Sequence, residues 1–315
     1  MNTPNTTDDW LLANGDVLLI HAKRILHWKL ENKMVGRVFA KLTMYDRFCD
    51  AQNIHVAQEI RSAIDLLSER FQVPPVVTYE CLILLNDLTH SPSLFSKEYV
   101  QDETLFYKTH QDIEYLFFEI HEAVFDFYAW NIKDIDIKHI LLNLRYINKK
   151  LHTLVSIMKT EAFNSFRPYW DLTSHYRTDE NGETYPGPSW AYSCWFVYMD
   201  ILLWIKEHTI AHYSMDDRML PNISWSGYIT KNELEELKRF VIEQGTLSSI
   251  LWEQTESVKS LKKAILKFRF WHKQAAKKYI WDANLEKPGT WQSINANTFL
   301  DAHIEATKSS ISENI

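Results

Sequence analysis

Two histidines in this sequence lie among residues whose spacing predicts burial, and each could bind or orient a ligand there. His110 follows Phe106 by four residues, which places both side chains on one face of a helix. That face continues with apolar residues at helical spacing, namely Ile113, Phe117, Ile120 and Val124. Spacing alone leaves two interpretations of His110: a core histidine satisfied by a neighbour, or a histidine that faces a ligand.

His272 belongs to a second stripe of this kind. Apolar residues step by three and four on both sides of it, at Val258, Leu261, Ile265, Phe268, Ala276 and Tyr279. The opposite face is strongly basic, with Lys262, Lys263, Lys267, Arg269, Lys273, Lys277 and Lys278. This face could simply be solvated. Alternatively, some of its cations could meet the propionates of a heme whose iron His272 ligates, because a neutral imidazole on a rigid helix is the ordinary proximal ligand of heme iron.

Arg167 is the third residue that could do chemistry, because it lies between Phe166 and Pro168 in a segment dense with aromatics. A buried guanidinium needs an anionic partner. The partner could be a carboxylate of the protein, or a substrate carboxylate held by two parallel hydrogen bonds.

Other catalytic patterns are weaker. His208 and His212 are four residues apart and could form a metal pair, but the His-Glu-x-x-His order of zinc proteases is absent. No Glu-x-x-His occurs, which argues against a carboxylate-bridged di-iron bundle. Neither of the glycine-rich phosphate-binding loops is present.

In order along the chain, these segments resemble the tryptophan 2,3-dioxygenase and indoleamine 2,3-dioxygenase superfamily of heme proteins. DETLFYKTHQDIEYLFFEI, from residue 102, is similar to the distal helix of tryptophan dioxygenase. FNSFRPYW, from residue 163, resembles the family's Phe-Arg segment. KFRFWHKQAAKKYIW, from residue 267, resembles the proximal helix of indoleamine dioxygenase. YPGPSWAYSCWFVYMDILLW and PGTWQS resemble the family's serine-containing helix and its Gly-Thr loop.

This resemblance implies heme b on His272 and a distal side formed by His110 and Phe106. It further implies a substrate site with Arg167 on the carboxylate, Phe163 and Ser189 (or Ser193) beside the substrate, and Thr290 on the ammonium group. The implied reaction inserts dioxygen into the 2,3-bond of tryptophan or a substituted indole. The YPGPS segment is closer to the pyrrolnitrin-biosynthesis heme enzymes, so monooxygenation of tyrosine or an indole is the alternative. A second alternative is a non-enzymatic heme-binding protein. Because members of the family are often oligomers, the resemblance also implies a possible homo-oligomer.

The elements that position these residues are predicted to be helices. The 315 residues include only 7 Gly and 9 Pro, about 5% of the chain, whereas average usage is roughly 12%. Few turns are therefore expected, and the expected fold is all-α. The resemblance implies a helical heme-binding bundle. Helices are predicted over about 9–32, 36–71, 77–89, 97–130, 134–160, 161–170, 190–208, 231–243, 246–281 and 296–310. Residues 171–189 form the one clear long loop.

Composition and charge limit the class of protein. An N-terminal helical region over 1–95 and a heme-binding catalytic region over 96–315 are expected, within one continuous domain. The net charge of −7 gives no footprint for nucleic acid as the main partner. The sequence contains no run of 18 apolar residues without a charge, so no membrane-spanning helix is expected. Three scattered cysteines and an acidic N-terminus without a signal peptide predict a reducing, cytoplasmic location.

Overall fold

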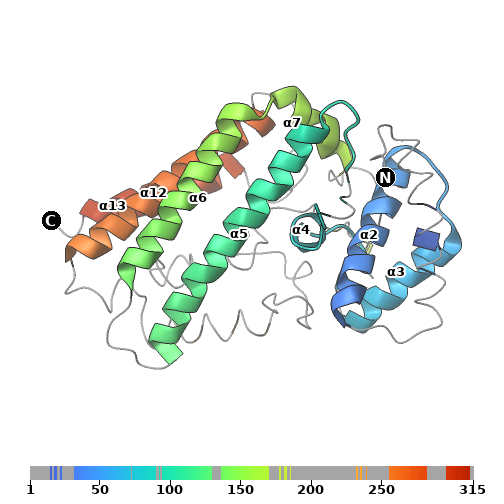
Figure 1. Ribbon diagram of the computed structural model, residues 1–315, viewed down its shortest axis with the longest axis horizontal. Helices are drawn as coiled ribbons and strands as arrows, with labels where there is room; N and C mark the ends of the chain where they lie inside the picture. Colours follow the sequence, from blue (N-terminus) through green and yellow to red (C-terminus); the bar gives the residue numbers. More distant parts are fainter. Residues whose placement is uncertain are drawn as a thin grey trace. The chain divides into compact units, whose positions relative to one another are not determined.

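A computed structural model describes part of the chain. It covers residues 32–71, 73–89, 92, 94–129, 136–169, 177–178, 181–182, 185, 255–281 and 296–312, with isolated positions 15, 18, 19, 22, 232, 235 and 239. These residues are mostly helical and contain no strand element, which confirms the all-α prediction (Figure 1). The predicted helix over 190–208, and most of the predicted segments 9–32, 171–189 and 231–243, lie outside the described residues. In the described part, no helix has both the length and the apolar character needed to cross a membrane.

The chain forms two compact units, each assembled from separate stretches of sequence. Unit 1 contains residues 1–108, 158–192 and 216–231, and unit 2 contains 109–157, 193–215 and 232–315. The boundary at residue 108 falls inside one long helix, α5 (Val100–Ala129), which matches the helix predicted over 97–130.

The first long helices of unit 1 that the structure describes are α2 (Asn32–Ala51) and α3 (Gln58–Phe71), where the sequence predicted one continuous helix from 36 to 71. That prediction was wrong because Asn53 takes a left-handed conformation, with φ at 56°. The amide of Ile54 then donates to the Cys49 carbonyl at 2.8 Å, and the amide of Asn53 donates to Asp50 at 3.0 Å. This Schellman-type pair of bonds ends α2 without a glycine or a proline.

Apart from the start of α5, the other elements described in unit 1 are short. The predicted helix over 77–89 is reduced to α4 (Tyr79–Leu82), which the Thr78 hydroxyl caps by accepting from the Cys81 amide at 3.2 Å. The segment predicted over 161–170 forms α7 (Thr160–Phe166) followed by a 3-10 turn, η1 (Arg167–Tyr169).

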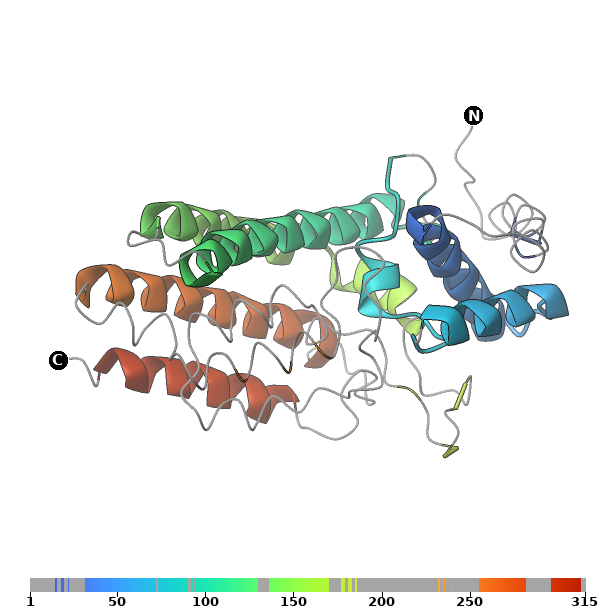
Figure 2. The ribbon, with the colours of Figure 1, turned by 90° about the horizontal axis from the view of Figure 1, so that it is seen from below.

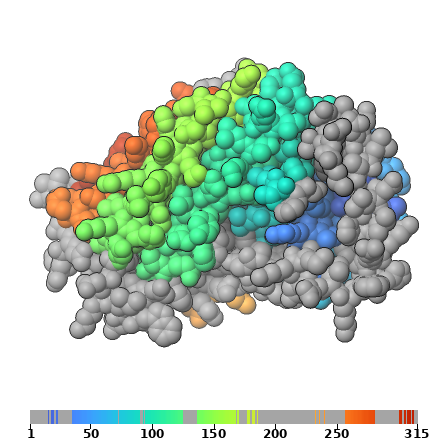
Figure 3. Space-filling model, viewed as in Figure 1, coloured from blue at the N-terminus to red at the C-terminus, as the bar shows by residue number. Residues whose placement is uncertain are grey.

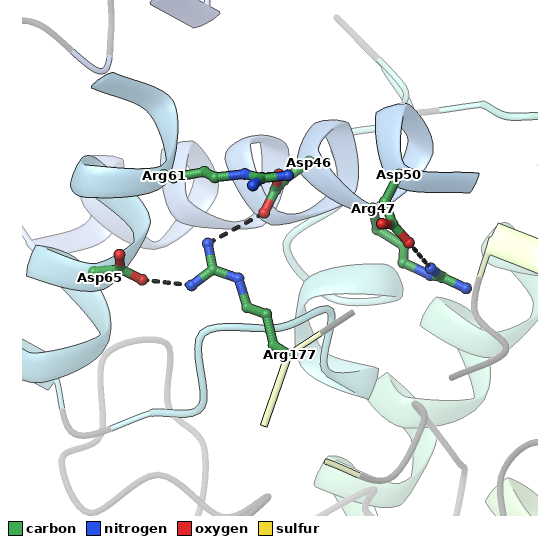
Figure 4. A network of polar contacts seen from close by, with 6 residues as sticks. All are labelled: Asp46, Arg47, Asp50, Arg61, Asp65 and Arg177. Atoms are coloured by element: carbon green, nitrogen blue, oxygen red, sulfur yellow. Dashed lines mark hydrogen bonds and ion pairs between the residues drawn. The ribbon is translucent and has the colours of Figure 1, made fainter. Parts of the chain in front are cut away.

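A charged network joins residue 177 to the α2–α3 pair within unit 1 (Figure 4). The fully buried carboxylate of Asp46 accepts from Nε of Arg61 at 3.2 Å and from Nη2 of Arg177 at 3.2 Å. Arg177 also pairs with Asp65 on α3. Charges placed this way are satisfied by one another, and they fix residue 177 to both helices.

Unit 2 is a layer of long helices. After α5, the chain forms α6 (Ile137–Ile157), α12 (Thr255–Ala276) with a terminal π-helical turn η4 (Lys277–Trp281), and α13 (Ala296–Ser312). Helix α12 packs against α6 on one side and α13 on the other (Figures 1 and 2). The core side of α6 is an apolar stripe at helical spacing, formed by Ile137, Ile140, Leu144, Ile147, Leu151 and Leu154.

Hydrogen bonds and ion pairs between these helices show their relative directions. Asn148 of α6 donates to the Ala264 carbonyl of α12 at 3.1 Å, and Tyr279 of η4 donates to the Leu154 carbonyl at 3.1 Å, so α6 and α12 run parallel. Lys150 of α6 pairs with Asp112 of α5 at 2.6 Å, while His139 lies 3.7 Å from Glu119. Helix α5 therefore runs antiparallel to both α6 and α12.

Candidate functional site

The part of α5 in unit 2 presents polar side chains to the interior. His110 is only 6% exposed, so the inward direction predicted from its spacing is confirmed. Glu114 and His121 are also buried on this helix, at 1% and 7% exposure, beside the fully buried Phe117. His110 is therefore one of several polar groups on the buried face of α5.

His272 lies one turn beyond a buried phenylalanine on α12. Its ring is 5.9 Å from the ring of Phe268, and the side chain is half-buried. The apolar stripe predicted around it is buried at Val258, Leu261, Ile265, Phe268 and Tyr279. The helix thus holds His272 on the side of α12 that faces the interior.

The row of cations predicted on the opposite side of α12 is only partly exposed. The sequence predicted that all of these cations face outward, and this was wrong for two of them. Lys262 and Arg269 are buried, at 6% and 3% exposure. The guanidinium of Arg269 donates to the Thr307 hydroxyl at 2.6 Å. The reason is the packing of α13, which covers that flank of α12.

A ring contact shows that the two histidines lie on facing helices. Phe117 of α5 meets Phe268 of α12 edge to face, with ring centroids 5.5 Å apart. His110 precedes Phe117 by about two turns, and His272 follows Phe268 by about one turn, each on the same helix face as its phenylalanine. Because α5 and α12 are antiparallel, both histidines lie toward the same end of the Phe117–Phe268 contact.

In unit 1, three of the other predicted residues form one cluster. The Phe106 ring lies 5.8 Å from Phe163 and 5.6 Å from Phe166. The guanidinium carbon of Arg167 lies 6.0 Å from the centre of the Phe163 ring, and Arg167 is only 5% exposed. Arg167 is therefore a buried cation against an aromatic wall, at the junction of α7 and η1.

A buried carboxylate stands next to this aromatic cluster. Glu103 accepts hydrogen bonds from the Phe95 and Ser96 amides, at 3.0 and 2.7 Å, and from the Tyr107 hydroxyl at 2.8 Å. Burial raises the pKa of its carboxyl from 4.5 to about 7, and these three bonds offset part of that rise. The ring of Tyr107 in turn lies 6.3 Å from Phe166. Glu103 thus fixes the start of α5 and one wall of the cluster.

Several predicted residues lie outside the part of the chain that the structure describes. These are Ser189, Ser193 and Thr290, together with the alternative metal pair His208 and His212. Their predicted roles stay predictions. Among the described residues, no group of three or more His, Cys, Asp or Glu could hold a metal ion.

The imidazole of His272 suits a heme, but most of the cations near it do not face outward as the sequence predicted. An imidazole on a long, well-packed helix is a suitable axial ligand for heme iron. Three cations near it have protein partners instead of facing outward: Arg269 binds Thr307, Lys273 pairs with Asp301, and Lys278 donates to the Val155 carbonyl at 2.6 Å. Among the α12 and η4 cations near His272, only Lys267 and Lys277 are exposed.

Sequence reasoning did not single out Glu103, Glu114 and His121. A signal for Glu114 was present, because it follows His110 by four residues and therefore shares its inward face. The same spacing places Glu103 on this face, seven residues before His110, but it could not identify the amides of Phe95 and Ser96, which belong to an irregular segment that only folding brings near.

Comparison of the sequence with models of known protein families gives no match, and comparison with curated proteins gives none either.

Proposed function

We propose that this chain is a heme-dependent oxygenase that acts on an aromatic amino acid, with tryptophan or a substituted indole as substrate. One observation carries the proposal. His110 and His272 lie on the facing sides of two antiparallel helices, toward the same end of the Phe117–Phe268 contact. The sequence resemblance to the tryptophan and indoleamine dioxygenases supports the same assignment.

His272 would hold the cofactor by coordinating the heme iron through its imidazole. The bound heme would supply the activation of dioxygen, which no amino-acid side chain provides. The half-buried position of His272 against Phe268 restrains the imidazole ring, and a restrained ligand keeps its nitrogen directed to one point.

His110 would orient the aromatic ring of the substrate. A buried imidazole can accept a hydrogen bond from an indole N–H or from a phenol through its unprotonated nitrogen. At 6% exposure His110 is shielded from water, so such a bond would meet little competition.

Arg167 would bind the substrate carboxylate with its planar, two-donor fork. Its guanidinium lies against Phe163, which keeps it away from bulk water and favours an anionic partner. Holding the carboxylate fixes the substrate before reaction, and positioning of this kind supplies much of the catalysis in such a reaction.

The ultraviolet–visible spectrum of the purified protein tests the cofactor assignment. We expect non-covalent heme b, because no Cys-x-x-Cys-His occurs for covalent attachment. His272→Ala should lose the heme or its histidine-ligated spectrum. His152→Ala is the matched control, since His152 is exposed on α6 and its ring contacts Trp271, the neighbour of His272. A wild-type spectrum in His272→Ala would contradict the assignment.

Arg167→Lys tests the enzymatic part of the proposal, because it keeps the charge and removes the fork. The loss of a buried ionic contact of this kind costs about 2–5 kcal/mol, or roughly 30- to 4,000-fold in affinity. Tryptophan or tyrosine should therefore perturb the wild-type heme spectrum at much lower concentration than the variant spectrum. Decarboxylated analogues should bind both proteins alike. Identical titrations with the amino acids would leave a heme carrier as the better description.

A further inference from the structure

Basic residues are concentrated in two neighbouring elements of unit 2. Helices α6 and α12, with the η4 turn, contain 12 of the 34 Lys and Arg but only one of the 41 Asp and Glu, Glu256. These elements therefore carry a net charge of +11 in a chain of net −7, and the remainder carries −18. Such a separation of charge creates a local positive potential that the net charge conceals.

Half of these cations point outward. Lys262 and Arg269 are buried, and four more have partners within the fold: Lys150, Lys259, Lys273 and Lys278. The other six are exposed, and none pairs with a carboxylate of a described residue. They are Lys138, Arg145, Lys149, Lys263, Lys267 and Lys277, called the basic face below.

The six cations lie on one side of the helix layer. Helices α6 and α12 are parallel neighbours, joined on their flanks by the contact of His152 with Trp271, whose ring centroids are 4.4 Å apart. On α6 the exposed cations recur at helical spacing opposite the apolar stripe, and on α12 they lie opposite Ile265 and Phe268. Both outer faces therefore turn the same way, and Figure 3 shows the surface of α6 with α12 beside it.

Large apolar side chains are exposed beside these cations. Seven large hydrophobic residues are exposed in the part of the chain that the structure describes, and four of them lie on α6 and α12. They are Leu142, Tyr146, Ile157 and Phe270, at 45%, 49%, 61% and 47% exposure. Apolar groups gathered at one surface commonly mark an interaction site.

We propose that the basic face, with these four apolar side chains, binds the surface of an anionic phospholipid membrane. Lysine and arginine interleaved with leucine, isoleucine and aromatic side chains are typical of helices that lie in the membrane interface. The cations meet lipid headgroups, while the apolar side chains enter the boundary between headgroups and acyl chains.

Two features favour a membrane over other anionic partners. Exposed aliphatic side chains such as Leu142 and Ile157 gain nothing from phosphate backbones and cannot stack on bases as aromatic ones do. The exposed charges of these elements are six cations and one carboxylate, Glu256, so they lack the balanced pattern of mixed charges that fixes the register of a protein partner. A fluid, uniformly anionic surface requires no such register.

The test measures sedimentation of the full-length protein with vesicles of phosphatidylcholine alone, and of phosphatidylcholine with about 30% phosphatidylserine. We expect binding to the second composition only, weakened at high salt. The triple variant Lys149→Gln, Lys263→Gln, Lys267→Gln should bind roughly 100-fold more weakly, since each lysine near such a surface contributes about fivefold. Phe270→Ser should weaken binding without changing its salt dependence.

A matched triple variant, Lys97→Gln, Lys108→Gln, Lys159→Gln, removes the same charge from exposed positions of unit 1 and should bind like the wild type. Circular dichroism melting confirms that each variant is folded. Equal loss in both triple variants would overturn the proposal, because net charge alone would then explain binding. The proposal also fails if a short DNA duplex binds through the basic face while vesicles do not, or if neither binds. None of these results depends on whether the protein holds heme.

Discussion

In unit 1, the buried charges are met by specific partners close at hand. The carboxylate of Asp46 lies between Arg61 and Arg177, and Glu103 accepts from two backbone amides and a tyrosine hydroxyl. In unit 2, buried polar groups such as His121 and Arg269 lie on the same helices as long apolar stripes, and Arg269 donates to the neutral hydroxyl of Thr307. Both units bury many apolar side chains. The difference therefore lies in how their buried polar groups are met, by opposite charges and backbone amides in unit 1 and within apolar helix faces in unit 2.

The largest effect is expected where the apolar core of unit 2 is cut. Phe268→Ala removes a ring that is 1% exposed and packs edge to face on Phe117, so it should lower the free energy of unfolding by about 4 kcal/mol. Phe270→Ala on the same helix removes a ring that is 47% exposed, and its effect should stay within about 0.5 kcal/mol. Urea denaturation of both variants measures the difference. Equal losses would show that α12 packs through its other face.

Breaking the charged network should have the largest effect in unit 1. Asp46→Asn removes the buried carboxylate that Arg61 and Arg177 share, and should cost about 3 kcal/mol. The control is Asp65→Asn, because Asp65 is 58% exposed and its pair with Arg177 should contribute at most about 1 kcal/mol. Denaturation midpoints at neutral pH compare the two. If Asp65→Asn lowers the free energy of unfolding as much as Asp46→Asn does, the burial of Asp46 does not explain the contribution of the network to stability.

The two units should also respond to pH in opposite directions. Burial raises the pKa of Glu103 to about 7, so the folded state holds this proton more tightly than the unfolded state does. Its contribution to stability is complete below pH 4.5 and is lost as the pH rises through 7, by about 2–3 kcal/mol. Burial lowers the pKa of His121 from 6.5 to about 4, so its contribution is complete above pH 6.5 and is lost as the pH falls to 4, by a similar amount.

Denaturation of two variants across this pH range separates the contributions. Glu103→Gln should remove the loss of stability between pH 4.5 and 7, leaving the acid side unchanged. His121→Gln should remove the loss between pH 6.5 and 4. If either variant keeps the wild-type pH profile, the residue it replaces does not carry that titration.

The sequence by itself determined several long helices and the inward direction of His110, because apolar residues at steps of three and four must share a helix face wherever that helix packs. This argument sufficed for α5, α6, α12 and α13, and for the burial of His110. It failed at residues 52–57, where neither glycine nor proline marks the end of α2. Asn53 adopts the left-handed conformation that asparagine tolerates, and periodicity cannot detect this.

Only the tertiary structure decided which polar groups are buried and what meets them. Lys262 and Arg269 belong to a face that is basic in sequence, yet they are buried because α13 packs on that flank of α12. Glu103 finds its partners eight and seven residues earlier in an irregular segment, and Asp46 finds Arg177 from 131 positions away. Periodicity reports a residue's direction on its own element. The partner that lies in that direction depends on contacts between distant segments, which form only when the chain folds.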